Sequence, residues 1–346
     1  MRTLLTGPFR WRQLFFLATR ERAEPALRHR LGEIEGFAMP EAEAEELRRL
    51  AMIEEFHATH LERRLHEALE ILEQAGIETM ILKGAALAYT VYGSFAERPM
   101  GDLDLLLLDS GRAKEARDLL RPSGWDWSGD IRDEARYAEH HHLPPLGDRA
   151  GTGLRLELHT ALFPRNQPFH GFAEDFVARR TSIPARDRTI LIPDLPDQLL
   201  HICLHFAWSH VMQVGAWRTM RDVDTIVRNG TVEWPAFVDR ARSYRAERCC
   251  YWTLRLARAI TDAPIPDTVL DDCQPRYPSA LLGWLEHRYL RRMLPTDATV
   301  QSARFDQMVW QLGIQPERSS RGAALPWNAM GPEAVGDTTV SGEEGL

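Results

Sequence analysis

The spacing of apolar residues divides the chain into two helical parts with a mixed region between them. Over residues 41–75, leucine and isoleucine recur three and four positions apart. This spacing predicts one long amphipathic helix, either continuous or broken once, that ends at Gly76. After Pro196 come four amphipathic blocks of helical length, separated by Gly, Pro or polar breaks: 196–211, 217–230, 234–247 and 249–261. The second half of the chain is therefore predicted to be helical.

Between these parts, short apolar runs alternate with helical spacings. "IETMIL" (77–82) and "GDLDLLLL" (101–108) read as strands, and "KGAALAYTVYG" (83–93) reads as a helix that closes at Gly93. A further helix is predicted over 110–124, where Ser110 is a candidate N-cap. Three more strands are expected, two of them forming a hairpin around the turn-rich 147–151: 136–146, 152–162 and 188–193.

These elements predict an α+β protein with a mixed β-sheet core. We expect an N-terminal helical segment over 1–76, a sheet-containing domain over 77–193 and a C-terminal helical domain over 194–313. Residues 314–346 are rich in Gly, Pro and acids, and no positive charge follows Arg321. We expect this tail to be disordered.

Composition narrows the class of protein. With 44% hydrophobic and 9% aromatic residues, the chain can fill a core, and no apolar run is long enough for a membrane span or a secretion signal. The net charge of −8 argues against a protein that coats nucleic acid. The four scattered cysteines suit reduced thiols. We expect a cytoplasmic protein with no membrane partner.

Two carboxylates interrupt the apolar strand predicted at 101–108. Asp102 and Asp104 are two residues apart, about 6.6 Å along a strand, so both project from the same face, opposite Leu103, Leu105 and Leu107. Two adjacent carboxylates repel each other unless a cation lies between them, and Mg²⁺ prefers such oxygen ligands. Glu157, in the strand "LRLELH", is the candidate third acid.

A bare D-x-D also occurs by chance, for example where Asp102 caps a turn. A second pair, Asp222 and Asp224, shows the contrast. It lies in a predicted helix, where two residues span about 200° and the side chains diverge. We interpret that pair as structural, with Asp222 a candidate partner of Arg218.

The chain resembles the nucleotidyltransferase fold shared with DNA polymerase beta and the aminoglycoside nucleotidyltransferases. More closely, "LKGAALAYTVY…ERPMGDLDLLL", "LELH" and "LLHICLHFAW…MRDVDTIV…VEWPAFVDRA" resemble an uncharacterised bacterial nucleotidyltransferase family, some of whose members are encoded beside lasso-peptide maturation genes. The resemblance covers roughly residues 45–260 and is specific as an ensemble rather than in any one motif.

The resemblance implies that Asp102, Asp104 and Glu157 bind two Mg²⁺ ions and that an NTP, with ATP as the expected nucleotide, is the substrate. It also places the turn at Lys83 and Gly84 near the phosphates, where Lys83 adds a point charge. Lys83 is one of only two lysines in the chain.

The phosphate-binding turn departs from the family pattern. Many nucleotidyltransferases carry Gly-Ser in that turn, whereas Ala85 follows Gly84 here. A literal Gly-Ser occurs at Gly93 and Ser94, but at the end of the predicted helix rather than its start. Topology favours Gly84, and Ser94 stays the alternative. Arg98, in the loop before the acidic strand, is either a phosphate or carboxylate ligand or a solvated loop arginine.

Several histidines lie near these elements. His159 shares a strand face with Glu157, so it is a candidate for orienting a ligand or approaching the acceptor. His201 and His205 are four apart on a helix but lack the glutamate of H-E-x-x-H, so a helix packed over the active-site cleft is favoured over zinc binding. The histidine run at 140–142 reads as structural, although alternate members could face Glu157.

These residues indicate the transfer of an NMP from an NTP to an unknown acceptor. The candidate acceptors are a small molecule, a peptide or a protein, and a step in the maturation of a peptide natural product is one candidate setting for the reaction. Two alternatives remain. One is a non-catalytic protein that keeps the fold and binds a partner through its helices. The other is a toxin-like enzyme that modifies tRNA ends, which the acidic charge disfavours because nucleic acid is an unlikely partner.

Overall fold

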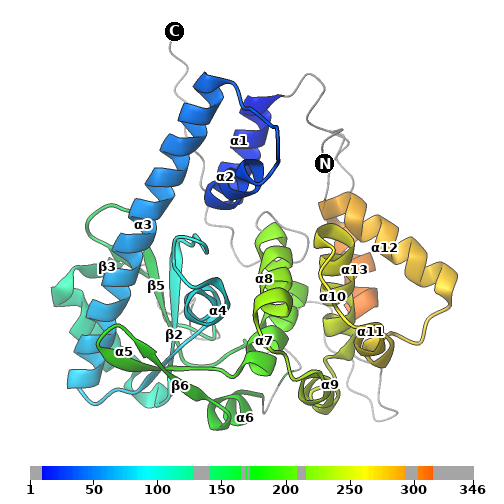
Figure 1. Ribbon diagram of the computed structural model, residues 1–346. Helices are drawn as coiled ribbons and strands as arrows, with labels where there is room; N and C mark the ends of the chain where they lie inside the picture. The colour runs from blue at the N-terminus through cyan, green and yellow to red at the C-terminus, as the bar shows by residue number, and fades with distance from the viewer. Residues whose placement is uncertain are drawn as a thin grey trace.

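The computed structural model describes residues 10–127, 137, 140–164, 169, 172–208, 216–293 and 303–314. Figure 1 shows a long N-terminal helix across a sheet on one side and a group of C-terminal helices on the other. The predicted disordered tail, apart from Ile314, lies outside the described residues.

The N-terminal segment consists of three helices, α1 (Trp11–Arg20), α2 (Glu24–Gly32) and α3 (Glu41–Gln74). The predicted long helix is continuous: α3 spans 34 residues without a break. It ends at Gln74, and Gly76, two residues later, has a φ of 67°, which favours glycine. The apolar face of α3 packs on one side of the sheet and buries leucines such as Leu65 and Leu72.

The sheet has seven strands in the order β3-β4-β5-β2-β1-β7-β6. The strands are β1 (Thr79–Ile81), β2 (Asp102–Leu107), β3 (Trp125–Trp127), β4 (Leu146–Asp148), β5 (Arg155–His159), β6 (Thr181–Ala185) and β7 (Arg188–Ile192). The pairs β2–β5 and β1–β7 are parallel, and the other neighbours are antiparallel. The predicted mixed sheet in an α+β fold is confirmed.

The strand predictions were right in the centre of the sheet and incomplete at its edges. β1, β2, β5 and β7 lie within the predicted runs. The first hairpin strand, expected over 136–146, is instead the short β4, because Pro144 and Pro145 precede it and proline cannot donate to a ladder. β3 and β6 were not predicted, since "WDW" is too short to show alternation and Pro184 interrupts β6.

Helices connect the strands. Between β1 and β2, α4 (Lys83–Leu87) continues as the π-helix η2 (Ala88–Tyr92) and stops at Gly93, whose φ is 82°. Wider π-turns of this kind often lie at functional sites. α5 (Ala113–Leu120) follows β2, and α6 (Phe172–Ala178) precedes β6.

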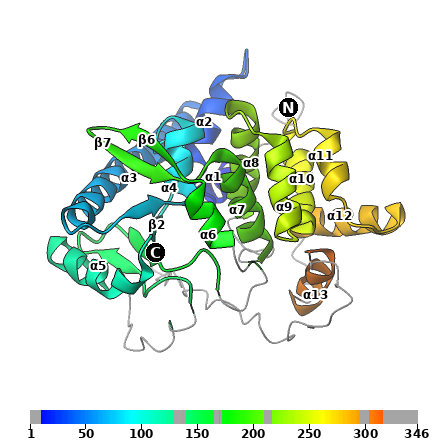
Figure 2. The ribbon, with the colours of Figure 1, turned by 90° about the horizontal axis from the view of Figure 1, so that it is seen from below.

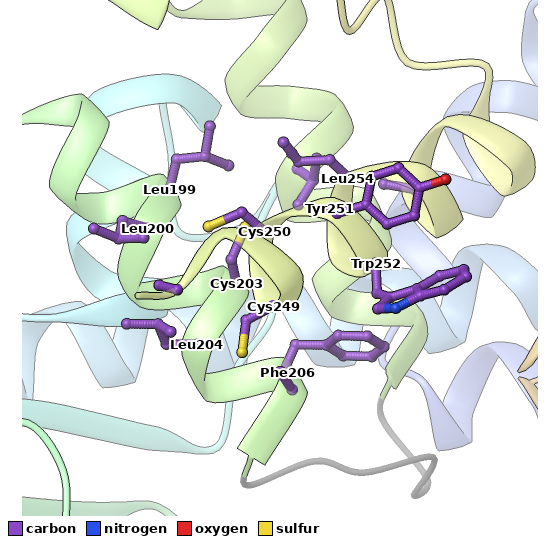
Figure 3. Close-up of a cluster of buried hydrophobic side chains, with 14 of the residues drawn as sticks. Leu199, Leu200, Cys203, Leu204, Phe206, Cys249, Cys250, Tyr251, Trp252 and Leu254 are labelled. Atoms are coloured by element: carbon purple, nitrogen blue, oxygen red, sulfur yellow. The ribbon is translucent and has the colours of Figure 1, made fainter. Parts of the chain in front are cut away.

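The C-terminal part contains seven described helices. They are α7 (Leu195–Trp208), α8 (Ala216–Asn229), α9 (Trp234–Ser243), α10 (Glu247–Thr261), α11 (Asp267–Cys273), α12 (Ser279–Met293) and α13 (Ala303–Ile314). Figure 3 shows the centre of this part, where α7 and α10 interlock through side chains such as Leu200, Cys203, Cys250 and Trp252. All four cysteines are free and buried.

The two faces of the sheet contact different helices. Leu103, Leu105 and Leu107 of β2 are buried beneath α3 and α5, as predicted. Leu106, on the other face, belongs to the core formed with α7 and the C-terminal helices. In Figure 2, α7 and α8 lie between the sheet and the remaining C-terminal helices. The face that carries Asp104 is therefore the one that the helical part covers.

In the described part of the chain, no helix is both long and apolar enough to cross a membrane.

Candidate active site

Register places the acids side by side. β2 and β5 run parallel, with Asp102 opposite Arg155, Asp104 opposite Glu157 and Leu106 opposite His159. Because alternate residues of a strand share a face, the acids at 102, 104 and 157 project from the same side of the sheet. The sequence-based expectation of a shared face is thus met by two central, neighbouring strands.

Lys83 reaches this face from the turn between β1 and α4. Its Nζ lies 2.7 Å from Oδ1 of Asp104, which is buried. Lys83 has a φ of 48°, a left-handed conformation that is uncommon outside glycine. The preceding residue, Leu82, donates its backbone N–H to the carbonyl of Asp104 at 3.0 Å, which fixes the turn against β2. Such backbone strain is typical of functional sites.

His159 joins the two acids. Its Nε2 donates to Oδ1 of Asp104 at 2.9 Å and lies 3.5 Å from Oε2 of Glu157. His159 is almost completely buried. Lys83 and His159 therefore contact the same oxygen of Asp104, so the protein itself supplies two basic groups beside the acid pair.

These contacts set the ionisation of the site. Burial alone would raise the pKa of Asp104, but Lys83 and His159 hold it well below its usual value. Burial likewise opposes a charged Glu157, yet the His159 hydrogen bond and the Lys83 charge lower its pKa. Burial would lower the pKa of His159, which the bonds to both acids raise overall. These shifts favour the ionised form of both acids and the protonated form of His159.

Asp102 differs from Asp104. It is exposed at the start of β2, and its side chain makes no hydrogen bond or ion pair within the described part of the chain. Partial desolvation and the negative charges of Asp104 and Glu157 raise its pKa, although Lys83 and Arg218 oppose the shift. Of the three acids, Asp102 is therefore the one that contacts no positively charged group among the described residues.

The donor set suits a divalent cation. One ligand atom from each of Asp104, Glu157 and His159 lies within 4.8 Å of the others. Among the described residues, the structure thus groups His159 with Asp104 and Glu157, whereas Asp102, the third predicted ligand, lies outside this group. Two carboxylates with an imidazole fit Mn²⁺ or Zn²⁺ as well as Mg²⁺, because nitrogen ligands suit transition metals. The metal-binding roles themselves stay a prediction.

Arg98 is engaged elsewhere. Its Nε and Nη2 donate to the two carboxylate oxygens of Asp222 on α8, at 2.6 and 2.8 Å, and its Nη1 donates to the Pro99 carbonyl. Tyr92 donates its hydroxyl to the same Asp222 at 2.7 Å. Asp222 therefore pairs with Arg98 rather than with Arg218. Arg98 lies near the acids, but its donors hold the loop before β2 on α8.

The side chains of the second D-x-D pair, Asp222 and Asp224, point in different directions, as expected for residues two apart in a helix. Asp222 is buried against Arg98, whereas Asp224 pairs with Arg228 one turn later at 2.7 Å. The structural interpretation of this pair is consistent with both contacts.

Gly84 and Ser94 lie at opposite ends of the α4–η2 helix. A side chain on Gly84 would meet Sδ of Met100 at 3.1 Å and Cζ of Arg98 at 3.6 Å, so the loop 98–100 packs directly on this glycine. Ser94 accepts a hydrogen bond from the backbone N–H of Glu97 at 3.3 Å and closes a local turn. Gly84 is the one beside Lys83.

A group of histidines packs behind His159. The ring of His141 lies 5.1 Å from that of His159, and the ring of His142 lies 5.4 Å from it, measured between centroids. His142 donates from Nδ1 to the carbonyl of Leu143 at 2.7 Å, and burial lowers the pKa of both His141 and His142. These contacts support the structural interpretation of the histidine run.

α7 brings His201 over the same region. It is buried, packs edge-on against Phe163 and Phe176, and burial together with Lys83 and His159 lowers its pKa to about 3. His205 follows one turn later, with its ring 6.2 Å from that of His201. Among the described residues, neither histidine belongs to a candidate metal-binding group.

Two features of the site carry no local sequence signal. Arg98 and Asp222 are 124 residues apart, and neither composition nor spacing links them. The contact of His159 with both acids depends on the parallel register of β2 and β5. A hint existed in "LELH", whose alternation places His159 on the acidic face.

Comparison with known proteins supports a family assignment. No curated protein and no solved structure matched the chain. A family model described as "Uncharacterised nucleotidyltransferase" matches residues 7–262, which include the whole sheet, the acids and α7 to α10. The chain, with its acidic strand pair under α7, belongs to this family of uncharacterised nucleotidyltransferases.

Proposed function

We propose that this protein is a divalent-metal-dependent nucleotidyltransferase that transfers the NMP of an NTP, with ATP as the expected nucleotide, to an acceptor nucleophile. The observation that carries the proposal is the cluster of Asp104, Glu157 and His159 on adjacent parallel strands, with Asp102 and Lys83 beside it. Family membership supports the same reaction class.

The residues suit this chemistry in a defined way. Lys83 and His159 keep Asp104 and Glu157 ionised, so a cation meets carboxylates that need no deprotonation. Asp104, Glu157 and Asp102 are the residues that would hold the metal, and His159 would join them only in its deprotonated form, because a protonated ring has no lone pair to give. Bound Mg²⁺, expected as two ions, supplies charge neutralisation at the phosphates and lowers the pKa of the attacking hydroxyl.

The transfer itself is a displacement at the α-phosphorus. The acceptor oxygen forms a bond to that phosphorus while the bond to the bridging oxygen of pyrophosphate breaks, and the acceptor proton is lost to water. Lys83 and Gly84 lie at the N-terminal end of α4, and we place the phosphates near Lys83 because its charge already faces the acids.

The acceptor is proposed from the resemblance alone. Relatives encoded beside lasso-peptide maturation genes favour a peptide or a maturation-pathway protein over nucleic acid, and the net charge of −8 agrees with this preference.

Calorimetry with non-hydrolysable analogues of ATP, GTP, CTP and UTP, with and without Mg²⁺, tests the proposal. We expect metal-dependent binding that is lost in Asp104→Asn and in Glu157→Gln. Because Asn at 104 leaves Lys83 without its closest charge partner, the half-buried Glu157 provides the second variant. Asp224→Asn, from the other D-x-D pair, is the control and should bind as wild type.

Other outcomes would redirect the assignment. Absence of nucleotide binding to the wild type under every metal condition would favour the non-catalytic, partner-binding alternative. Growth arrest on expression, suppressed by Asp104→Asn, would favour the toxin-like tRNA-modifying alternative.

A further inference from the structure

Arg218, in the first turn of α8, is a half-buried arginine whose guanidinium contacts no described side chain or backbone group. Within the described part of the chain it forms neither a hydrogen bond nor an ion pair. Asp222, one helical turn later, is already occupied by Arg98 and Tyr92. A guanidinium carries five N–H donors, so leaving it unpaired in a partly desolvated place is costly.

Two other arginines converge on the same place. Arg98 is held on α8 by Asp222, directly before the acidic strand. Arg22, from the turn between α1 and α2, donates to the carbonyl of Met100 at 3.2 Å. Its Nη2 lies so close to Gly101 that a Cβ there would come within 2.8 Å. Both are tied to the segment that leads into Asp102.

Electrostatics connect Arg218 with this group. Burial and the positive charges of Arg98 and Arg22 lower its pKa, while Asp102 and Asp222 act in the opposite direction. Asp102 in turn feels the charge of Arg218, yet the two form no ion pair. Arg218 and Asp222 lie one helical turn apart on the same face of α8, and Asp222 binds Arg98 in the loop that leads into Asp102.

This arrangement fits an anion that contacts the Arg218 guanidinium on one side and a cation held by the acids on the other. A guanidinium binds two oxygens of a phosphate in a planar, bidentate manner. Lys83 is bound to Asp104, and the donors of Arg98 are directed to Asp222 and Pro99. Of Lys83, Arg22, Arg98 and Arg218, only Arg218 has all of its donors available to a ligand, as far as the described residues show.

We propose that Arg218 binds a phosphate of the nucleoside triphosphate chain, so that α8 of the helical part completes the nucleotide site of the sheet. This inference rests on the proposed nucleotidyl transfer. It makes Arg218 a binding residue, and it gives the Arg98–Asp222 pair the role of positioning α8 against the acidic strand.

Titration calorimetry of Arg218→Ala and Arg218→Gln with inorganic tripolyphosphate, ATP and AMP tests this role. We expect at least a tenfold loss of affinity for tripolyphosphate and ATP and less than a twofold change for AMP. Arg228→Ala is the matched control, because Arg228 lies on the same helix and pairs with Asp224, and it should bind all three as wild type. Thermal melts should show both Arg218 variants at least as stable as wild type, since each removes an unpaired charge flanked by two arginines.

The outcomes separate the two proposals. Wild-type affinity for tripolyphosphate and ATP in both Arg218 variants would overturn the role of Arg218, whatever the reaction is. If the loss appears only as a raised KM for a phosphorylated acceptor, the triphosphate assignment is also overturned. A wild type that binds tripolyphosphate through Arg218 but binds no nucleotide would instead overturn the proposed function and leave the anion site standing.

Discussion

Lys83 shows how much one side chain contributes to this site. Its left-handed backbone places Nζ on Asp104, and burial, which alone would lower the pKa of Lys83, is outweighed by Asp104 and Glu157, so that the pKa is raised. Lys83 therefore stays charged and stabilises the acids in their ionised form. The ammonium group of Lys83 is also available to an incoming triphosphate.

We expect Lys83→Ala to weaken NTP binding by about ten- to a hundredfold, the loss typical of a charge-assisted contact. Calorimetry with a non-hydrolysable analogue measures the effect. Lys114→Ala, at the only other lysine of the chain and on the exposed side of α5, should leave the affinity unchanged. Unchanged affinity in Lys83→Ala would move the phosphate site away from this turn and make Ser94 the next candidate.

At the scale of elements, the loop before β2 and the helix α8 are fastened to each other. Arg98 and Asp222 form a bidentate, buried ion pair, and Tyr92 at the end of η2 adds a third hydrogen bond. A buried pair is not a strong source of net stability, but breaking it leaves one charge without a partner. The position of α8 over the acidic edge depends on this contact.

Asp222→Ala should lower the free energy of unfolding by about 3–5 kcal/mol, because it strands the Arg98 guanidinium in the interior. Urea denaturation measures the change. Asp224→Ala, two residues away on the same helix, removes a more exposed pair with Arg228 and should cost less than about 1 kcal/mol. If both variants lowered the free energy of unfolding equally, the Arg98–Asp222 pair would not be what holds the loop on α8.

For the whole molecule, the acid response depends on histidines that are buried, such as His141 and His201, or half-buried, such as His142. Burial lowers the pKa of His201 to about 3, and it also lowers the pKa of His141 and His142. His159 has the opposite shift. Because the unfolded chain binds protons below about pH 6.5 and these three histidines do not, acid favours unfolding.

The pH dependence follows from the sign of these shifts. The stability that a neutral His201 contributes is complete above about pH 6.5 and is lost as the pH falls toward 3. Between pH 7 and pH 5 we expect the free energy of unfolding to decrease, with His201 contributing up to about 1.4 kcal/mol per pH unit. Urea denaturation at several pH values should show a shallower slope for His201→Leu. An unchanged slope would mean that His201 is protonated in the folded protein.

The sequence by itself determined the order of elements and the chemistry of one strand. Alternation fixes which side of a strand each residue faces, so Asp102, Asp104 and Glu157 could be assigned to one side and Leu103, Leu105 and Leu107 to the core, as the structure confirms. Helical spacing likewise gave the long α3 and the helical second half. Periodicity is a local property, so these predictions needed no knowledge of tertiary contacts.

Only the tertiary structure decided what meets at the site. The parallel register of β2 and β5 brings His159 to Asp104, and the packing of α8 brings Asp222 to Arg98 across 124 residues. The edge strands β3 and β6 likewise form by pairing with their neighbours rather than by their own pattern. Such contacts form when segments far apart in the chain pack together and bury their charged groups. A short window of sequence does not contain this information. That Arg218 has no partner among the described residues became visible only once the partners of its neighbours were known.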